Sequence, residues 1–170
     1  MNGRVPVAVR VGTFEFGKKV MAGDDQKWQP LTRETADHSI PYVVACALAR
    51  GRVNREDLDE SQLTAPDIAA LLDVLSVEVD RECAAAWPDA CMNRVTVSFA
   101  DGGEESAAVR YYRGHARNPM SDRELEGKFR DQAASVISGA DADDLVKAVW
   151  TLDEAASLEA LFGWTARDGG

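Results

Sequence analysis

The 170-residue sequence predicts an α+β domain, with a small, mainly antiparallel sheet and helices packed on one side. Three patterns of apolar and turn residues, in order along the chain, indicate this fold. Alternating valines open the chain, capped helical stretches with apolar faces follow, and two alternating stretches joined by a glycine turn precede the last helices. Strands and helices mixed in this irregular order are typical of α+β domains rather than of helical bundles or sandwiches.

The chain opens with a predicted strand, because Val5, Val7, Val9 and Val11 alternate with other residues. A period of two places these valines on one face of a strand against a core. Residues 21–33 contain glycine, aspartate and proline with little periodicity, so they are predicted to form a loop of about a dozen residues.

Two helices are predicted next, each with a proline in its first turn. In the first, Asp37 or Ser39 can cap the free amides, Pro41 lies in the first turn and Gly51 ends the helix. The second begins within residues 64–67 and precedes a strand predicted within residues 74–79. Its apolar face is predicted to contain Ile68, Leu71, Leu72 and Leu75.

A hairpin and terminal helices complete the predicted fold. Residues 95–99 alternate, the stretch 101–103 (DGG) provides a tight turn, and residues 107–112 return as the partner strand. Ser121 and Glu124 form a capping box ahead of a helix whose apolar face is predicted to hold Leu125, Phe129 and Ala133. Shorter helices are expected at 141–150 and 153–162, and a flexible tail at 165–170.

The charge balance disfavours polyanionic partners. The chain carries 19 Lys and Arg against 29 Asp and Glu, which gives a formal net charge of −10. A field of this sign repels nucleic acids and anionic membrane surfaces. No apolar run approaches the roughly 20 residues that cross a bilayer, and the first residues lack the apolar core of a signal peptide. We therefore expect a cytoplasmic protein that binds neither nucleic acid nor membrane.

The cysteine and histidine content gives no sign of a metal or cofactor. Three cysteines, no CxxC pair and only two histidines indicate neither a zinc site nor a disulfide framework. The two neighbouring glycines belong to the predicted hairpin and not to a phosphate-binding loop. Free thiols and no cofactor are expected.

One segment departs from the acidic average. Residues 106–121 contain Arg110, Arg113, Arg117 and His115 and no acidic residue. Arginine forks bind carboxylates and phosphates bidentately, so this segment is a candidate anion-binding site. The alternative is that these arginines pair with the many surface acids elsewhere in the fold.

A second candidate lies at the start of the first predicted helix, where His38 stands beside a capping aspartate. A histidine in such a place can serve as an acid, a base or an anion contact. The structural alternative is that His38 only bonds a neighbouring carbonyl while Asp37 and Ser39 cap the helix.

These two segments resemble signature stretches of a known family. Residues 33–45 (RETADHSIPYVVA) and 114–129 (GHARNPMSDRELEGKF) are similar to two stretches of the MmgE/PrpD family, the 2-methylcitrate dehydratase-like proteins. The likeness covers residues 5–161, and two long matches in order are more specific than a short motif.

The resemblance implies only part of a larger enzyme. Members of the family have a large helical N-terminal domain followed by a smaller domain, and residues 1–164 resemble the smaller, C-terminal one, with the helical domain absent. Known activities include dehydration of 2-methylcitrate, decarboxylation of cis-aconitate and epimerisation of iminodisuccinate, without a required metal. The chain is thus expected to be the C-terminal domain or small subunit of a metal-independent lyase or isomerase acting on polycarboxylates, inactive alone.

The resemblance also implies site residues and partners. His38 and Tyr42 of the first stretch are the expected catalytic residues, and Arg113, His115 and Arg117 are the expected contacts of a small carboxylate ligand. The expected partner is a helical protein like the family's N-terminal domain, in a homo- or hetero-oligomer. The alternative function is a non-catalytic remnant or an anion- or protein-binding module.

The resemblance also bears on the type of reaction. In the decarboxylase branch, the first strand carries a tyrosine that falls near Phe14 or Phe16 here. Phenylalanine offers no hydroxyl, which argues against decarboxylase-type chemistry.

Overall fold

The computed structural model of the chain describes residues 4–159 and residue 161. The chain divides into two compact units, residues 1–118 and residues 119–170. The tail predicted at 165–170 and the end of the helix predicted at 153–162 lie outside the described residues. The assignment of residues 1–164 to a single domain stays a prediction.

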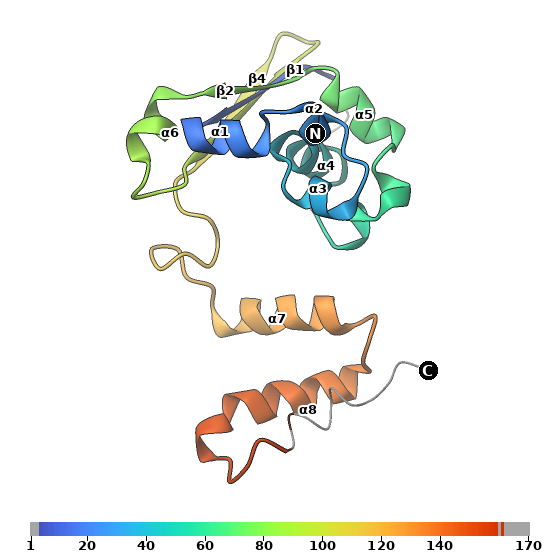
Figure 1. Cartoon of the computed structure of the whole chain (residues 1–170), viewed down its shortest axis with the longest axis vertical. Helices are drawn as coiled ribbons and strands as arrows, with labels where there is room; N and C mark the ends of the chain where they lie inside the picture. The colour runs from blue at the N-terminus through green and yellow to red at the C-terminus, as the bar shows by residue number, and fades with distance from the viewer. Residues whose placement is uncertain (1–3, 160, 162–170) are drawn as a thin grey trace. The chain divides into compact units, whose positions relative to one another are not determined.

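The first unit contains a four-stranded sheet with helices against it (Figure 1). Its strands are β1 (Pro6–Thr13), β2 (Leu75–Val79), β3 (Asn93–Phe99) and β4 (Glu104–Val109). Their order is β2-β1-β3-β4, in which only β1 and β2 are parallel. The predicted α+β class with a mainly antiparallel sheet is confirmed.

The return strand of the hairpin lies closer to the turn than predicted. Gly102 has a φ of +82°, and the tight turn pairs Ser98 with Glu104. Strand β4 therefore covers residues 104–109, and residues 110–112 of the predicted strand lie outside it. The segment after β4 is thereby free to form a loop.

One face of this sheet carries the core. Cross-strand register places Val9 between Leu75 and Val97, and all three are buried. They share a core cluster with Ile68 and Tyr42 from the helices that cover this face. Because successive residues of a strand point to opposite faces, the intervening positions form a polar second face, where the Thr96 and Ser106 hydroxyls lie 2.9 Å apart.

The helices of the first unit are mostly short. They are α1 (Glu15–Met21), α2 (Asp25–Trp28), α3 (Arg33–Asp37), α4 (Ile40–Arg50), η1 (Glu56–Leu58), η2 (Glu60–Gln62), α5 (Pro66–Leu72) and α6 (Arg81–Ala86). The predicted caps of α4 are confirmed. Ser39 accepts a hydrogen bond from the backbone N–H of Tyr42, and Gly51 ends the helix with a φ of +73°.

Several short helices differ from the predicted elements. The loop predicted at 21–33 contains α2 and leads into α3, and α1 and α6 have no predicted counterpart. Helices of four to six residues span fewer than two turns and show no clear apolar period, so α2, α3 and α6 are marked only by a capping side chain, and α1 has no side-chain cap. Asp24 caps α2, Thr32 caps α3 and Asp80 caps α6. Leu75, assigned to the apolar face of α5, is the first residue of β2.

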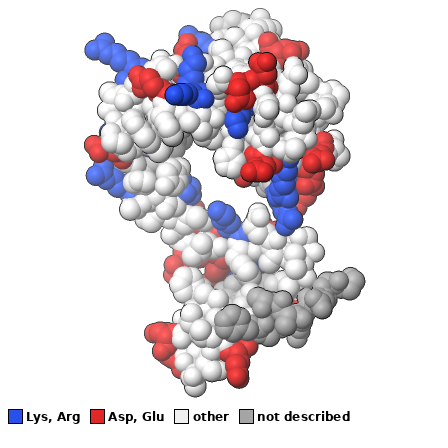
Figure 2. All heavy atoms as spheres, in the orientation of Figure 1, with Lys and Arg blue, Asp and Glu red and all other residues white. Residues whose placement is uncertain are grey.

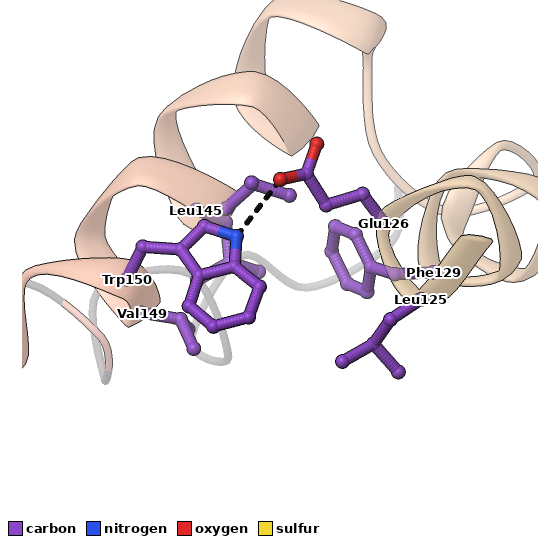
Figure 3. Close-up of a pocket in the computed structure, with 7 residues that line it drawn as sticks. Leu125, Glu126, Phe129, Leu145, Val149 and Trp150 are labelled. Carbon is purple, nitrogen blue, oxygen red and sulfur yellow. Dashed lines mark hydrogen bonds between the residues drawn. The ribbon is translucent and has the colours of Figure 1, made fainter. Parts of the chain in front are cut away.

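The second unit consists of two helices and a short 3₁₀ turn, α7 (Asp122–Ala133), α8 (Gly139–Trp150) and η3 (Leu152–Glu154). The predicted capping box of Ser121 and Glu124 is present. An apolar pocket of about 320 Å³ lies between α7 and α8, and the Trp150 indole donates to Glu126 across it at 2.9 Å (Figure 3).

The surface shows no segregation of charge over the first unit in the view of Figure 2, where acidic and basic side chains are interspersed. Within the described residues, no helix is long and apolar enough to cross a membrane. The same residues hold no group of three or more His, Cys, Asp or Glu side chains that could bind a metal ion.

Candidate functional site

The arginine-rich segment forms a closed loop after β4, which we call the cationic loop (Arg110–Asn118). Gly114, with a φ of +96°, donates its N–H to the Asn118 carbonyl at 2.9 Å, and the Asn118 N–H returns to the His115 carbonyl at 2.7 Å. The Asn118 side chain also donates to the Tyr111 carbonyl at 2.9 Å. The three arginines of the loop, Arg110, Arg113 and Arg117, are exposed.

Tyr111 organises two of the arginines. Its hydroxyl oxygen accepts hydrogen bonds from Arg110 Nε at 3.4 Å and from Arg117 Nη1 at 2.6 Å. These bonds lower the pKa of the Tyr111 phenol, because they favour its anionic form. Among the described residues, neither Arg110 nor Arg117 forms an ion pair with a carboxylate. Two guanidiniums thus share one neutral oxygen, an arrangement suited to an added anion.

His115 is held between two aromatic rings. Its imidazole stacks on Tyr111 with ring centroids 4.9 Å apart, and its edge contact with Tyr112 has a centroid distance of 5.3 Å. Nδ1 of His115 accepts the backbone N–H of Arg117 at 3.0 Å. The neutral ring must therefore carry its proton on Nε2, which makes His115 a hydrogen-bond donor at that atom.

Arg113 also lies in the cationic loop, where its Nη1 donates to the Asn118 side-chain oxygen at 2.9 Å. The structure thus places the three expected carboxylate contacts, Arg113, His115 and Arg117, on one short loop. Their role as substrate contacts stays a prediction.

His38 lies at the C-terminal end of α3. Unlike in His115, the ring nitrogen that carries the proton is Nδ1. Its Nδ1 is 3.0 Å from the Glu34 carbonyl oxygen, which can only accept, so Nδ1 donates. In the neutral ring, Nε2 then carries a lone pair, as a base requires. His38 is exposed and lines a small polar pocket of about 220 Å³ together with Lys27, Glu34 and Thr35.

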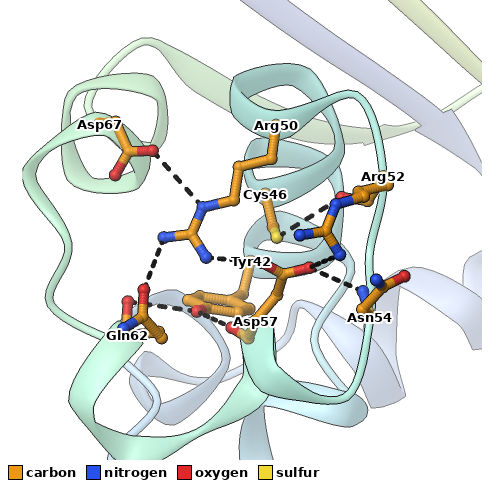
Figure 4. A network of polar contacts seen from close by, with 8 residues as sticks. All are labelled: Tyr42, Cys46, Arg50, Arg52, Asn54, Asp57, Gln62 and Asp67. Carbon is orange, nitrogen blue, oxygen red and sulfur yellow. Dashed lines mark hydrogen bonds and ion pairs between the residues drawn. The ribbon is translucent and has the colours of Figure 1, made fainter. Parts of the chain in front are cut away.

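Tyr42 has a very different position. It lies in α4 with no exposed surface, and its hydroxyl donates to the Asp57 carbonyl at 2.8 Å (Figure 4). Burial raises the pKa of Tyr42 to about 12. Proton exchange between Tyr42 and a ligand requires this hydrogen bond to break. Its catalytic role stays a prediction.

The surroundings of Tyr42 form a polar network that joins α4 to η1. Arg50 donates to the Asp57 carboxylate at 2.7 Å and to Gln62 at 3.0 Å, and the Asn54 backbone N–H donates to Asp57 at 2.7 Å (Figure 4). Burial raises the pKa of Asp57, but the bonds from Arg50 and Asn54 outweigh it, so the pKa is lowered. These bonds satisfy a buried carboxylate, which is a structural function.

The two predicted sets of residues have different partners. The described hydrogen bonds of His38 and Tyr42 go to residues of their own helices and of η1 and η2, while the loop arginines gather around Tyr111 and Asn118. Sequence reasoning did not identify Tyr111 or Lys27. The one available signal for Tyr111 was its place next to Arg110 in the arginine-rich segment.

Comparison with curated proteins gives two relatives of one kind. The chain is 26% identical over 132 residues to human (Homo sapiens) cis-aconitate decarboxylase and 23% identical over 132 residues to the mouse (Mus musculus) protein of that name. Each match covers 78% of this chain and 27% of the relative. The chain thus spans about a quarter of the length of these relatives.

The sequence model described as the MmgE/PrpD C-terminal domain matches residues 7–154. That range includes the four-stranded sheet, the cationic loop and both helices α7 and α8. The resemblance inferred from the two signature stretches is confirmed, and the chain belongs to the MmgE/PrpD family, of which it carries the C-terminal domain.

Proposed function

We propose that this chain is the C-terminal domain or small subunit of a 2-methylcitrate dehydratase-like lyase or isomerase acting on small polycarboxylates. A helical domain like the family's N-terminal domain supplies most of the catalytic groups. Arg113, His115 and Arg117 contact a substrate carboxylate, His38 acts in proton transfer, and no metal takes part. Tyr42 belongs to the catalytic set only if its hydroxyl leaves the Asp57 carbonyl.

This proposal rests on the two histidines, whose neutral rings carry the proton on different nitrogens. His38 presents a lone pair at Nε2, while His115 presents an N–H at Nε2 beside arginine guanidiniums. Removal of a proton next to a carboxylate requires a base and cationic donors that stabilise the developing negative charge. Both kinds of group are present on this chain, in the two stretches that resemble the family signatures.

An exposed aromatic surface on this chain is evidence for the proposed helical partner. Phe16 and Trp87 are 58% and 41% exposed, and their rings stack with centroids 6.0 Å apart. Phe14 beneath them is buried and stacks on Trp87 at 4.4 Å. Exposed aromatic side chains grouped in this way are typical of surfaces that contact another protein. The partner and the resulting hetero-oligomer are part of the proposal.

One observation favours the second candidate function, a non-catalytic anion- or protein-binding module. Tyr42 has its hydroxyl bonded inside the core, which leaves His38 as the signature residue with an exposed base. A single base with a cationic loop can bind a carboxylate without turning it over. Binding without turnover in the complete assembly would favour this function.

Reconstitution with a helical MmgE/PrpD-like protein tests the proposal. The assembly is assayed with 2-methylcitrate, citrate and cis-aconitate, the last because both curated relatives are named for its decarboxylation. Product formation is followed by absorbance for the two dehydrations and by carbon dioxide release for cis-aconitate. Turnover by the assembly and not by either protein alone is the expected result, and turnover by this chain alone would contradict the proposal.

Variants of the assembly separate the two roles. Arg117→Ala should raise KM about tenfold or more, because a charged hydrogen bond to a carboxylate is lost. His38→Ala should lower kcat by about 100-fold, in the range of a lost general base, with a smaller change in KM. Arg81→Ala, an exposed arginine outside the cationic loop, is the matched control. An unchanged KM in Arg117→Ala would refute the carboxylate contact.

A further inference from the structure

Strand β4 (Glu104–Val109) forms an open edge of the sheet. It ends the order β2-β1-β3-β4, and β3 is the one strand that pairs with it within the described part of the chain. All six of its residues are exposed. Proteins usually protect such an edge with lysine, proline or a bulge, because its unpaired N–H and C=O groups attract another strand. β4 contains neither lysine nor proline, and its register with β3 is regular, so its edge is open to a further strand.

The outward-facing backbone groups of β4 belong to its even-numbered residues. Beside the turn, the Phe99 N–H donates to the Gly103 carbonyl at 2.9 Å, so the backbone of Gly103 faces β3. The direction of these groups alternates along an antiparallel strand, so Glu104, Ser106 and Ala108 direct theirs away from β3. A second strand must therefore place its own outward-facing residues opposite these three.

The charges at the two ends of β4 are opposite in sign. Glu104 begins the strand and Arg110 directly follows it, and both side chains are exposed. Arg110 Nε is 3.4 Å from the Tyr111 hydroxyl, but no carboxylate of the described residues pairs with this guanidinium. Glu104 forms a long ion pair with Arg10 at 3.6 Å. Cross-strand pairs of opposite charge are stabilising, so the strand suits a partner with the same charges in reversed order.

A second, antiparallel copy of β4 has that reversed order. With Ala107 of each copy on a two-fold axis, Ser106 lies opposite Ala108 of the second copy, which matches the outward-facing residues of the two strands. The same register places Glu104 opposite Arg110 of the second copy, and the symmetry repeats this pair. A shift of two residues in either direction no longer places these charges opposite each other.

We propose that two copies of this chain pair antiparallel through β4 in this register, which joins their two sheets across an axis at Ala107. The paired edge goes beyond the proposed function, because β4 and Arg110 belong neither to the three proposed substrate contacts nor to the aromatic surface assigned to the helical partner. Association of this chain with itself is measured without any turnover.

The pairing is expected to be weak. A strand of six residues buries less surface than a stable interface requires, and each copy carries a net charge of −10. At about 0.15 M salt, the Debye length of about 8 Å screens most of that repulsion but not the directly opposed Glu104 and Arg110. Sedimentation equilibrium of the unaltered chain should therefore show a dimer with a Kd on the order of 100 μM. A chain that remains monomeric at about 1 mM would overturn the proposal and leave the edge to a strand of another protein.

Disulfide trapping tests the register. In a Cys91→Ser background, the two remaining cysteines, Cys46 and Cys83, are buried. Ala107→Cys should then give a disulfide-linked dimer under mild oxidation by copper phenanthroline, because the two Cα atoms lie about 4.5 Å apart in a pair without backbone hydrogen bonds of its own. Val109→Cys is the matched control on the same face and should cross-link about tenfold more slowly, since four residues, or about 13 Å, separate its two copies along the strand. Equal rates of cross-linking in the two variants would refute the register.

Charge reversal tests the ion pairs. Glu104→Arg and Arg110→Glu each place like charges opposite each other twice, so each should raise Kd about tenfold. In an equal mixture of the two variants, both pairs of the mixed dimer are again opposite in charge, and its Kd should return to that of the unaltered chain. Glu60→Arg and Arg81→Glu make the same charge changes at exposed positions outside β4 and are the matched controls. A mixture that dimerises no better than either variant alone would contradict the ion pairs.

Ala108→Pro tests the backbone pairing. Proline removes the outward-facing N–H of this position and leaves the bonds to β3 intact, so the dimer should be lost. Circular dichroism and the midpoint of guanidinium unfolding check that the fold is retained. If this variant does not fold, the mixture of charge-reversal variants still decides the outcome. Unchanged dimerisation of a folded Ala108→Pro chain would place the contact elsewhere and overturn the proposal.

Discussion

Tyr42 and Tyr111 both lie close to arginine side chains, but among the described residues only the arginine near Tyr42 is paired with a carboxylate. Around Tyr42, Arg50 is paired with the buried Asp57 carboxylate at 2.7 Å, and the phenol donates its proton to a backbone carbonyl. Around Tyr111, Arg110 and Arg117 bond to the phenol oxygen itself. The first region satisfies its charges internally and stabilises the fold, whereas the second retains positive charge that an anion can use.

The largest effect is expected from breaking the ion pair of the Tyr42 region. Asp57→Ala leaves Arg50 without its closest carboxylate and the Asn54 N–H without its acceptor. Loss of one partner of a buried pair should lower the free energy of unfolding by about 3 kcal/mol. Guanidinium unfolding at pH 7 measures it, with exposed Glu60→Ala as the control. A loss no larger than that of the control would show that the pair contributes little.

A smaller effect is expected from the phenol of the same region. Tyr42→Phe removes the hydroxyl that donates to the Asp57 carbonyl and should lower the free energy of unfolding by about 1 kcal/mol. Tyr112→Phe, at a tyrosine that is 57% exposed, is the matched control and should leave the stability unchanged.

The same Tyr42→Phe variant tests the catalytic prediction for this residue. If Tyr42 acts only in the fold, kcat of the reconstituted assembly should remain near that of the unaltered chain. A large fall in kcat together with retained stability would instead assign the hydroxyl a catalytic role, and would mean that it leaves the Asp57 carbonyl during the reaction.

Acid should weaken the Tyr42 region before it affects the arginines. The pKa of Asp57 in the folded protein is lowered below the roughly 3.9 of an unfolded aspartate, so its contribution to stability is complete above about pH 5. That contribution is lost as the pH falls through the folded pKa. Urea unfolding from pH 7 to pH 3 should therefore show a shallower pH dependence in Asp57→Asn. An identical slope in both proteins would contradict the assignment.

Local signals made part of this molecule predictable. Ser39 and Gly51 bound α4 as expected, and the Ser121 capping box begins α7, because a cap is read from residues a few positions apart. The strand alternation of β1 and β3 likewise needs no distant information, but of the four valines expected against the core only Val9 and Val11 are buried, whereas Val5 and Val7 are 64% and 51% exposed. Both family signatures were also recognisable, since each is a continuous stretch of sequence.

Contacts between distant residues were not predictable. Tyr42 meets the Asp57 carbonyl 15 residues away, and no spacing rule marks that pair. Nothing local reveals that the Thr13 hydroxyl has no hydrogen-bond partner within the described residues, because that depends on the packing around it, where Gly17 of α1 lies close. In the cationic loop the arginines were identified, but their arrangement around Tyr111 depends on the turn at Gly114, whose backbone bonds close the loop.

The smallest effect, and the sharpest comparison, comes from titrating the two phenols. Hydrogen bonds from Arg110 and Arg117 lower the pKa of Tyr111, whereas burial raises that of Tyr42 to about 12. Absorbance at 295 nm should therefore show Tyr111 ionising first and Tyr42 last. The first step should vanish in Tyr111→Phe and shift to higher pH in Arg117→Ala, but not in the control Arg81→Ala.

The lowered pKa of Tyr111 determines how its ionisation changes the stability of the fold with pH. Since its folded pKa lies below the unfolded value of about 10, the phenolate form is favoured by folding, and its contribution grows as the pH rises toward that value. A carboxylate that occupies the same guanidiniums competes with the phenolate, so citrate should move the first ionisation to higher pH. An ionisation unaffected by citrate and by Arg117→Ala would mean that the guanidiniums hold no exchangeable anion, and the contrast with the Tyr42 region would then concern burial alone.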